Sequence, residues 1–209
     1  MIESSIRQNA SYIQTLTLLS ALAIIYFALA VFLLHILAPD FNPINRFISE
    51  YAQSAYNYIL NSGFILLGVG SILLVLVLLR LKVGHRLLGK IGLILLTVWA
   101  LAVMMDGIFQ IDPGVEPVTT SGKIHLLSAM VAFLSFMIAS LVLSLVFRKH
   151  ASLNSISRPA LVLVVLIYLS FFVSNITDFA PGLIQRLFVL FCLGWLSFVA
   201  LSIRRMVAG

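Results

Sequence analysis

Six continuous apolar stretches constrain this chain more than any other feature of its sequence. Each is close to the roughly 20 residues that a helix needs to cross a bilayer, and none alternates as a strand of a membrane barrel would. The stretches cover about residues 15–38, 57–80, 91–110, 124–147, 159–177 and 183–203. We therefore predict an all-α integral membrane bundle of six transmembrane helices, with residues 1–209 forming a single domain.

The composition excludes the other broad classes of protein. Hydrophobic residues make up 62% of the chain and charged residues only 10%, whereas a soluble domain carries about 25% charged residues. A soluble domain, a disordered chain and a fibrous repeat are therefore excluded. The first stretch is too long for a signal peptide and precedes no small-residue cleavage site, so we expect it to stay as a helix. The single cysteine, Cys192, excludes a disulfide framework and is expected to be a packing residue.

The charges are sorted between alternate connections. One side has ten basic residues and one acid, which are Arg7, Arg80, Lys82, Arg86, Lys90, Arg148, Lys149, Arg158, Arg204, Arg205 and Glu3. The other side has three basic residues and six acids, which are Arg46, Lys123, Arg186, Asp40, Glu50, Asp106, Asp112, Glu116 and Asp178. The positive-inside rule predicts that the basic side and both termini are cytoplasmic. The net charge of +6 is therefore explained by the orientation of the chain in the membrane, and we expect no nucleic-acid partner.

The first outer connection combines proline, charged and aromatic residues. Pro39 and Pro43 are expected to end the first helix and start a new element. The segment RFISEYAQSAYNYIL is typical of a short interfacial helix leading into the second span, and its aromatic residues suit the aromatic belt of a membrane. Within it, Ser49 lies within a turn of Arg46 and Glu50, which have the spacing of a helical ion pair. A surface ion pair and an arginine that binds an anion at head-group depth both stay open.

The second outer connection is rich in acids. Asp106 lies inside the third apolar stretch, where a charge costs about 2.5–3.5 kcal/mol on insertion scales, which makes it a candidate functional residue. A neutral or capped carboxyl meeting interfacial water is the alternative. Asp112 begins an Asp-Pro-Gly turn signal and could be only a turn former. The plausible N-caps of the next helix are Thr119, Thr120 and Ser121.

His125 lies in the first turn of the predicted fourth helix. Helical spacing places it on one face with small residues, which are Ser128, Ala132, Ser135 and Ala139. Small residues in membrane helices mark the face on which another helix packs. We therefore expect His125 to point into the bundle, as either a hydrogen-bonded structural residue or a functional one.

The remaining outer residues extend this polar layer. Asp178 and Arg186 could close a salt bridge across the third connection. The whole layer comprises His35, Arg46, Ser49, Glu50, Asp106, Asp112, His125, Asn175, Asp178 and Arg186. Their common depth on one side of a small bundle predicts a polar cavity that opens outward.

The outer segments NRFISEY, GIFQIDPG with GKIHLL, and GLIQRL resemble the motifs of a bacterial and archaeal membrane family catalogued as domain of unknown function 998. The resemblance covers nearly the whole chain. The matching positions are Arg46, Ser49 and Glu50 in the first motif, Gly107, Asp112 and His125 in the second, and Arg186 in the third. Gln185 departs from the pattern, because a glutamate often precedes the last arginine in such sequences. The resemblance implies a six-helix protein of a prokaryotic plasma (inner) membrane and brings no activity with it.

Two other families are similar in fewer respects. The ISE motif and the helix count resemble eukaryotic Frag1/DRAM/Sfk1-type proteins, which are linked to lipid handling. The ceramidase and adiponectin-receptor hydrolases are another comparison, and they look like enzymes with a metal site of three histidines. The outer side of this chain has only two histidines, His35 and His125. A zinc site would need a carboxylate such as Asp106 or Asp112 as its third ligand, and no His-x-x-x-His pair is present.

The favoured function is an outer-leaflet site for an anion or a lipid head group. Arg46 and Arg186 would hold phosphate or carboxylate, because guanidinium groups bind these anions through two parallel hydrogen bonds. The other predicted ligand-binding residues are Glu50, Asp106 and Asp178. A membrane lipid is then the expected partner.

Catalysis and two further functions stay open. In a lipid hydrolase or head-group transferase, Asp112 would orient His125, and Ser49 or a water would be the nucleophile. A small proton-coupled transporter would use Asp106 and His125, although the apolar middles of the stretches argue against a transport path. A non-catalytic scaffold or assembly factor would use the polar layer only to tie its helices together.

Overall fold

The computed structural model describes residues 2–114, 117–177 and 179–208. Its long helices are α1 (Ile2–Leu37), α2 (Asn57–Arg80), α3 (Leu87–Ile108), α4 (Thr120–Phe147), α5 (Asn154–Ile176) and α6 (Pro181–Ala208). Two short 3-10 helices are η1 (Ile48–Gln53) and η2 (Val83–His85). All six long helices are long and apolar enough to cross a membrane, so six candidate membrane spans lie where the apolar stretches predicted helices.

The helices extend beyond several of the apolar stretches. α3 begins at Leu87, before the stretch at 91–110, and α5 begins at Asn154, so that Pro159 lies inside the helix. The helix α1 ends at Leu37, close to the predicted break at Pro39. Backbone hydrogen bonds continue through polar residues, so hydropathy locates the apolar part of a helix better than its ends.

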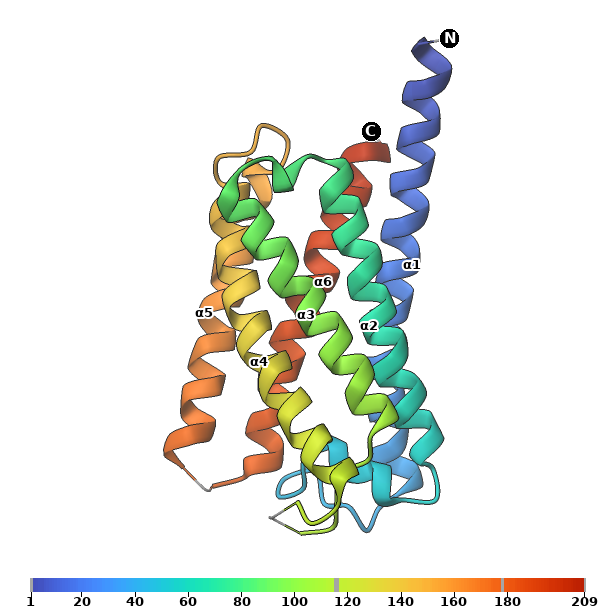
Figure 1. Cartoon of the computed structure of the whole chain (residues 1–209), viewed down its shortest axis with the longest axis vertical. Helices are drawn as coiled ribbons and strands as arrows, with labels where there is room; N and C mark the ends of the chain where they lie inside the picture. Colours follow the sequence, from blue (N-terminus) through green and yellow to red (C-terminus); the bar gives the residue numbers. More distant parts are fainter. Residues whose placement is uncertain (1, 115–116, 178, 209) are drawn as a thin grey trace.

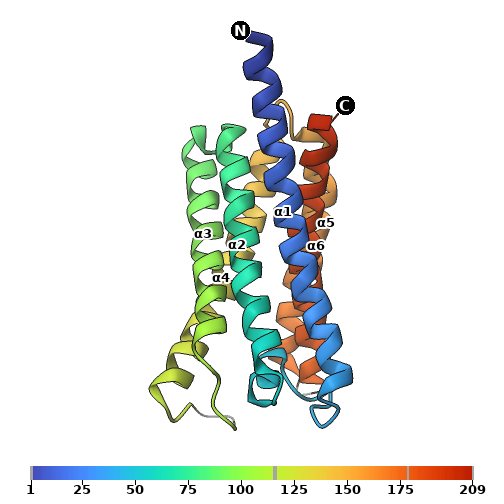
Figure 2. The same ribbon diagram turned by 90° about the vertical axis from the view of Figure 1, so that its right-hand side faces the viewer.

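The six helices form a ring in chain order. Each helix packs against the next along the chain, and α6 returns to pack against α1 (Figures 1 and 2). Both termini and the connections α2–α3 and α4–α5 lie at one end of the bundle, here the terminal end. The other three connections, one of which contains η1, lie at the opposite end, which we call the η1 end. Cys192 is buried in the core, as expected of a packing residue.

Aromatic side chains fill the centre of the ring. The rings of Trp99 and Phe136 lie 4.6 Å apart, and those of Phe136 and Trp195 lie 5.8 Å apart. The indole N–H groups of Trp99 and Trp195 donate to the hydroxyls of Ser71 and Ser144, at 3.1 and 3.0 Å. Because the polar edge of each indole is satisfied, these large side chains can occupy an apolar interior.

The first connection contains a short helix, the 3-10 helix η1. The prediction that this helix leads directly into α2 is wrong. The backbone is extended at Ser54 (ψ 166°), and α2 begins only at Asn57. The Ser54 hydroxyl donates to the Tyr51 carbonyl and accepts from the Tyr56 N–H. Such local side-chain bonds compete with a continuous helix and end it.

Candidate functional site

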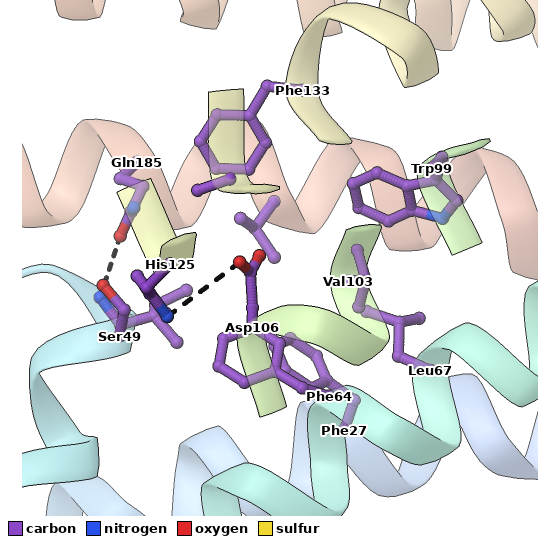
Figure 3. Close-up of a pocket in the computed structure, with 13 residues that line it drawn as sticks. Phe27, Ser49, Phe64, Leu67, Trp99, Val103, Asp106, His125, Phe133 and Gln185 are labelled. Carbon is purple, nitrogen blue, oxygen red and sulfur yellow. Dashed lines mark hydrogen bonds and ion pairs between the residues drawn. The ribbon is translucent and has the colours of Figure 1, made fainter. Parts of the chain in front are cut away.

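A cavity of about 50 Å³ lies inside the ring, between the aromatic centre and the η1 end. Residues of α1, α2, α3, α4 and α6, together with the segment that begins η1, line it. Its polar lining is Ser49, Asp106, His125 and Gln185, and its aromatic lining is Phe27, Phe64, Trp99 and Phe133. Figure 3 shows Asp106 and His125 facing each other, with Ser49 and Gln185 on the far side of His125. Three residues of the predicted polar layer, Ser49, Asp106 and His125, thus line one cavity, and most of its other lining is apolar.

Asp106 on α3 is the carboxylate of this cavity. The residue is only 6% exposed. Its Oδ1 is hydrogen bonded to the hydroxyl of Ser128 on α4, which also lies 2.9 Å from the carbonyl oxygen of His125. Within the described ranges, no lysine or arginine lies within 4.0 Å of Asp106. The carboxylate is therefore held in an apolar bundle without a permanent cation beside it.

His125 on α4 has a defined orientation. Its Nδ1 lies 2.8 Å from the carbonyl oxygen of Phe109 and 3.9 Å from Oδ1 of Asp106. A carbonyl oxygen only accepts, so Nδ1 carries the hydrogen of this bond and Nε2 is left as the acceptor of a neutral ring. The residue is 2% exposed, and the small residues on its face are buried with it. This confirms that His125 points into the bundle.

Asp112 lies outside the cavity, where its carboxylate organises the α3–α4 connection. Oδ2 accepts from the N–H groups of Val118 and Thr119, and Oδ1 accepts from the Thr119 hydroxyl, each at 2.7 Å. Thr119 also caps α4 by accepting from the Gly122 N–H at 3.0 Å. A Cβ at Gly122 would clash with the Asp112 carboxylate, so this close approach requires glycine. The hydrogen bonds from Thr119 hold the pKa of Asp112 below its usual value.

The structure therefore gives Asp112 the role of a turn former. Among the residues described, no contact joins Asp112 to His125, and the predicted orientation of the imidazole by this acid is not found. The carbonyl of Phe109 and the carboxylate of Asp106 flank the imidazole instead. Thr119, one of three candidate N-caps, is the one that caps α4.

Arg186 ties α6 to α1 and to the first connection. Its Nε donates to Nε2 of His35 at 3.0 Å, and its Nη1 donates to the carbonyls of Arg46 and Gly182 at 2.6 and 2.9 Å. Its guanidinium carbon lies 5.6 Å from the centre of the Tyr51 ring. Nη2 is buried and has no hydrogen-bond partner among the described residues. A Cβ at Gly182 would clash with the Arg46 carbonyl, so glycine allows the two backbones to approach.

Arg46, Glu50 and Arg186 form a charged group at the η1 end, here the arginine cluster. Nη1 of Arg46 lies 3.5 Å from Oε2 of Glu50, so the predicted pair forms, with Arg46 54% exposed and Glu50 14% exposed. Within the part of the chain that the structure describes, no carboxylate lies within 4.0 Å of Arg186. The described cluster therefore contains two guanidinium groups and one carboxylate, which is paired with Arg46, so it has an excess of positive charge.

The position of Tyr51 differs from the prediction that the aromatic residues of this segment belong to the aromatic belt. The residue is fully buried, and its hydroxyl donates to the Phe41 carbonyl at 3.0 Å. Its ring meets that of His35 edge-on at 5.6 Å and lies under Arg186. Tyr58, which is 64% exposed, does fit a belt position. Tyr51 is therefore part of the support of Arg186.

Sequence reasoning missed several residues of the site. Oε1 of Gln185 accepts from the backbone N–H of Ile48 at 2.8 Å and so connects α6 to η1 beside the cavity. Ser128 bonds Asp106 across the α3–α4 interface. Its position three residues after His125 on the small-residue face was the available signal. No signal pointed to the Phe109 carbonyl, because every residue has one.

The structure sorts the predicted site residues into groups. Ser49, Asp106 and His125 share the cavity, whereas Arg46, Glu50 and Arg186 form the arginine cluster. Asp178 lies outside the described residues, as does the side chain of Asn175. No three His, Cys, Asp or Glu side chains within the described ranges are placed to hold a metal ion, so His35, Asp106 and His125 do not converge on a zinc site.

Comparison with known proteins adds a family and no activity. One family model, described as "Protein of unknown function (DUF998)", matches residues 21–202. The comparisons with curated proteins and with solved structures found no match.

Proposed function

The chain belongs to the DUF998 family, whose description names no activity, and we propose that it is a multi-pass membrane protein that binds the phosphate of a lipid head group at its arginine cluster. The observation that carries the proposal is that Arg186 has no acidic partner among the described residues. Its guanidinium is half-buried, has no carboxylate within 4.0 Å among the described residues and leaves Nη2 unpaired. A partly buried charge without a counter-ion is costly, and a bound anion would remove that cost.

The chemistry of the cluster favours phosphate. Guanidinium groups match the oxygens of phosphate through two parallel hydrogen bonds. Arg46 has an exposed side chain, and its backbone carbonyl accepts from Arg186, so the two residues adjoin. The cluster lies at the ends of apolar helices, which is the depth of lipid head groups. A lipid phosphate is therefore the anion expected there.

The shape of the bundle favours binding over transport. The cavity ends against Trp99, and Phe136 and Trp195 continue the aromatic layer behind it. A transporter would place polar residues and its substrate site near the midplane. Large aromatic side chains occupy the layer behind the cavity instead.

Lipid retention tests the proposal. Purified protein is mixed with dioleoyl phosphatidylglycerol or with phosphate-free dioleoylglycerol, and retained lipid is measured by native mass spectrometry. We expect the phospholipid to be retained preferentially, and Arg46→Ala and Arg186→Lys to reduce its retention about tenfold, the equivalent of one lost charged hydrogen bond. Lys123→Ala is the matched control, because Lys123 is an exposed cation at the same end outside the cluster. Unchanged phospholipid retention in both arginine variants would overturn the proposal.

We also propose that the η1 end faces outward from a prokaryotic plasma membrane, with both termini in the cytoplasm. Ten of the thirteen basic residues are assigned to the terminal end, and the positive-inside rule supports this orientation. In a Cys192→Ser background, a membrane-impermeant maleimide applied to intact cells is expected to label Lys123→Cys and to spare Lys82→Cys. The reverse pattern would refute the orientation.

A further inference from the structure

The cavity contains an acidic group without a Lys or Arg partner among the described residues, the opposite of the arginine cluster. Asp106 is 6% exposed and projects toward the cavity in Figure 3. Its hydrogen-bond partner is the neutral hydroxyl of Ser128. No lysine or arginine of the described chain lies within 4.0 Å of it. An ionisable side chain inside a membrane bundle normally pairs with another group, so Asp106 marks a site for a cation.

His125 does not supply that cation. Its Nδ1 hydrogen is directed at the Phe109 carbonyl at 2.8 Å, whereas Asp106 is 3.9 Å away, beyond hydrogen-bond distance. With its Nδ1 hydrogen directed at the carbonyl, the ring in its neutral form has Nε2 as an acceptor. Carboxylate and imidazole together offer acceptors to a donor placed in the cavity.

The walls of the cavity suit an ammonium group. Phe27, Phe64, Trp99 and Phe133 contribute aromatic rings from four different helices. The negative faces of aromatic rings attract ammonium cations, and Trp does so most strongly. An acid surrounded by aromatic rings combines the two groups that recognise such a cation. A divalent metal would instead need several carboxylate or imidazole ligands, and the described residues supply no such group.

The volume limits the size of that ammonium group. A water needs about 10–15 Å³ of such space, so a cavity of about 50 Å³ holds roughly three to five small heavy atoms. A primary aminoethyl group has a nitrogen and two carbons and fits. A trimethylammonium-ethyl group has twice as many heavy atoms and exceeds this space.

The cavity and the arginine cluster share one wall. Ser49 and Gln185 line the cavity, and their neighbours in the chain, Glu50 and Arg186, belong to the cluster. Oε1 of Gln185 accepts from the backbone N–H of Ile48 at 2.8 Å and so joins η1 to α6 beside both sites. A site for an anion therefore adjoins a site for a cation.

We propose that the cavity receives the primary ammonium of a zwitterionic, ethanolamine-type phospholipid head group whose phosphate binds the arginine cluster. The inference rests on the proposed function for the phosphate half of the ligand. The ammonium half rests on Asp106 and the aromatic walls alone. One molecule then satisfies both charge imbalances of the η1 end.

The test compares three lipids with identical dioleoyl chains. Purified protein is offered phosphatidylethanolamine, phosphatidylcholine and phosphatidylglycerol in equal amounts, and retained lipid is counted by native mass spectrometry. We expect the wild type to retain phosphatidylethanolamine about tenfold over the other two, as one added charge contact provides. Asp106→Asn should abolish this preference and leave phosphatidylglycerol retention unchanged.

Two further variants complete the test, one that fills the cavity without changing Asp106 and one control. Ala129→Leu places a larger side chain in the lining of the cavity without touching a charge, and should remove the preference by filling the space. Asp112→Asn is the matched control, because this acid is at the same end but outside the cavity. It should leave the preference intact.

The outcomes separate this inference from the proposed function. Equal retention of all three lipids by the wild type, or an unchanged preference in both Asp106→Asn and Ala129→Leu, would overturn the ammonium site. If Arg46→Ala and Arg186→Lys both retain every phospholipid as the wild type does, the phosphate site fails instead. Loss of all three lipids in Arg46→Ala, with loss of the preference alone in Asp106→Asn, supports both halves.

Discussion

The Asp106→Asn variant is expected to be more stable than the wild-type protein by about 1–3 kcal/mol, because the substitution removes an uncompensated charge from an apolar bundle. The asparagine has nearly the same shape and keeps an oxygen that can accept from Ser128. The cavity is neither enlarged nor filled. Thermal unfolding of the purified protein in detergent, followed by circular dichroism, measures the change.

This result distinguishes a binding site from a scaffold. Functional residues are often kept at a cost in stability, so that their removal stabilises the fold. An acid that only ties helices together would instead destabilise the protein when replaced. Asp112→Ala is the comparison: its carboxylate holds Val118 and Thr119, so this variant should unfold at a lower temperature. A lower unfolding temperature for Asp106→Asn would support the scaffold.

The Arg186→Ala variant is expected to lose about 3–5 kcal/mol of unfolding free energy, because several partners of one partly buried charge are left unpaired together. The nitrogen of His35 and the carbonyl of Arg46 would lose their donor. The Tyr51 ring would lose the cation above it. Chemical unfolding in mixed micelles gives the free energy. The first connection should also become more accessible to protease.

Arg204 offers a control on the same helix. It also joins α6 to α1, and among the described residues it does so through one hydrogen bond from its Nη1 to the Gln14 carbonyl at 2.6 Å. Arg204→Ala should therefore cost only about 1 kcal/mol. Arg186→Lys should fall between the two, since an ammonium group keeps the charge and loses the planar fork. Equal losses in Arg186→Ala and Arg204→Ala would contradict the special role of Arg186.

Much of the fold was predictable because it depends on local properties of the chain. The apolar runs located all six spans, and the prolines located the end of α1 near Leu37. The small-residue face of α4 predicted correctly that His125 points inward. The segment after Pro43 was harder. Its composition suited a helix, whereas burial of Tyr51 and the hydrogen bonds of Ser54 produced η1 and a break.

The sequence by itself determined which polar residues gather at one end of the bundle, since span length and parity place every outer residue at a similar depth. It did not determine how they pair. Asp106 and Asp112 were both available to His125, and only the tertiary structure placed Asp106 in the cavity and gave Asp112 to the α4 cap. Likewise, only the packing of α6 against the first connection brought Arg186 to the Arg46 carbonyl, with no carboxylate of the described residues within 4.0 Å. Depth follows from position along a helix, but pairing depends on helix rotation and on loop paths, which contacts from the whole chain decide together.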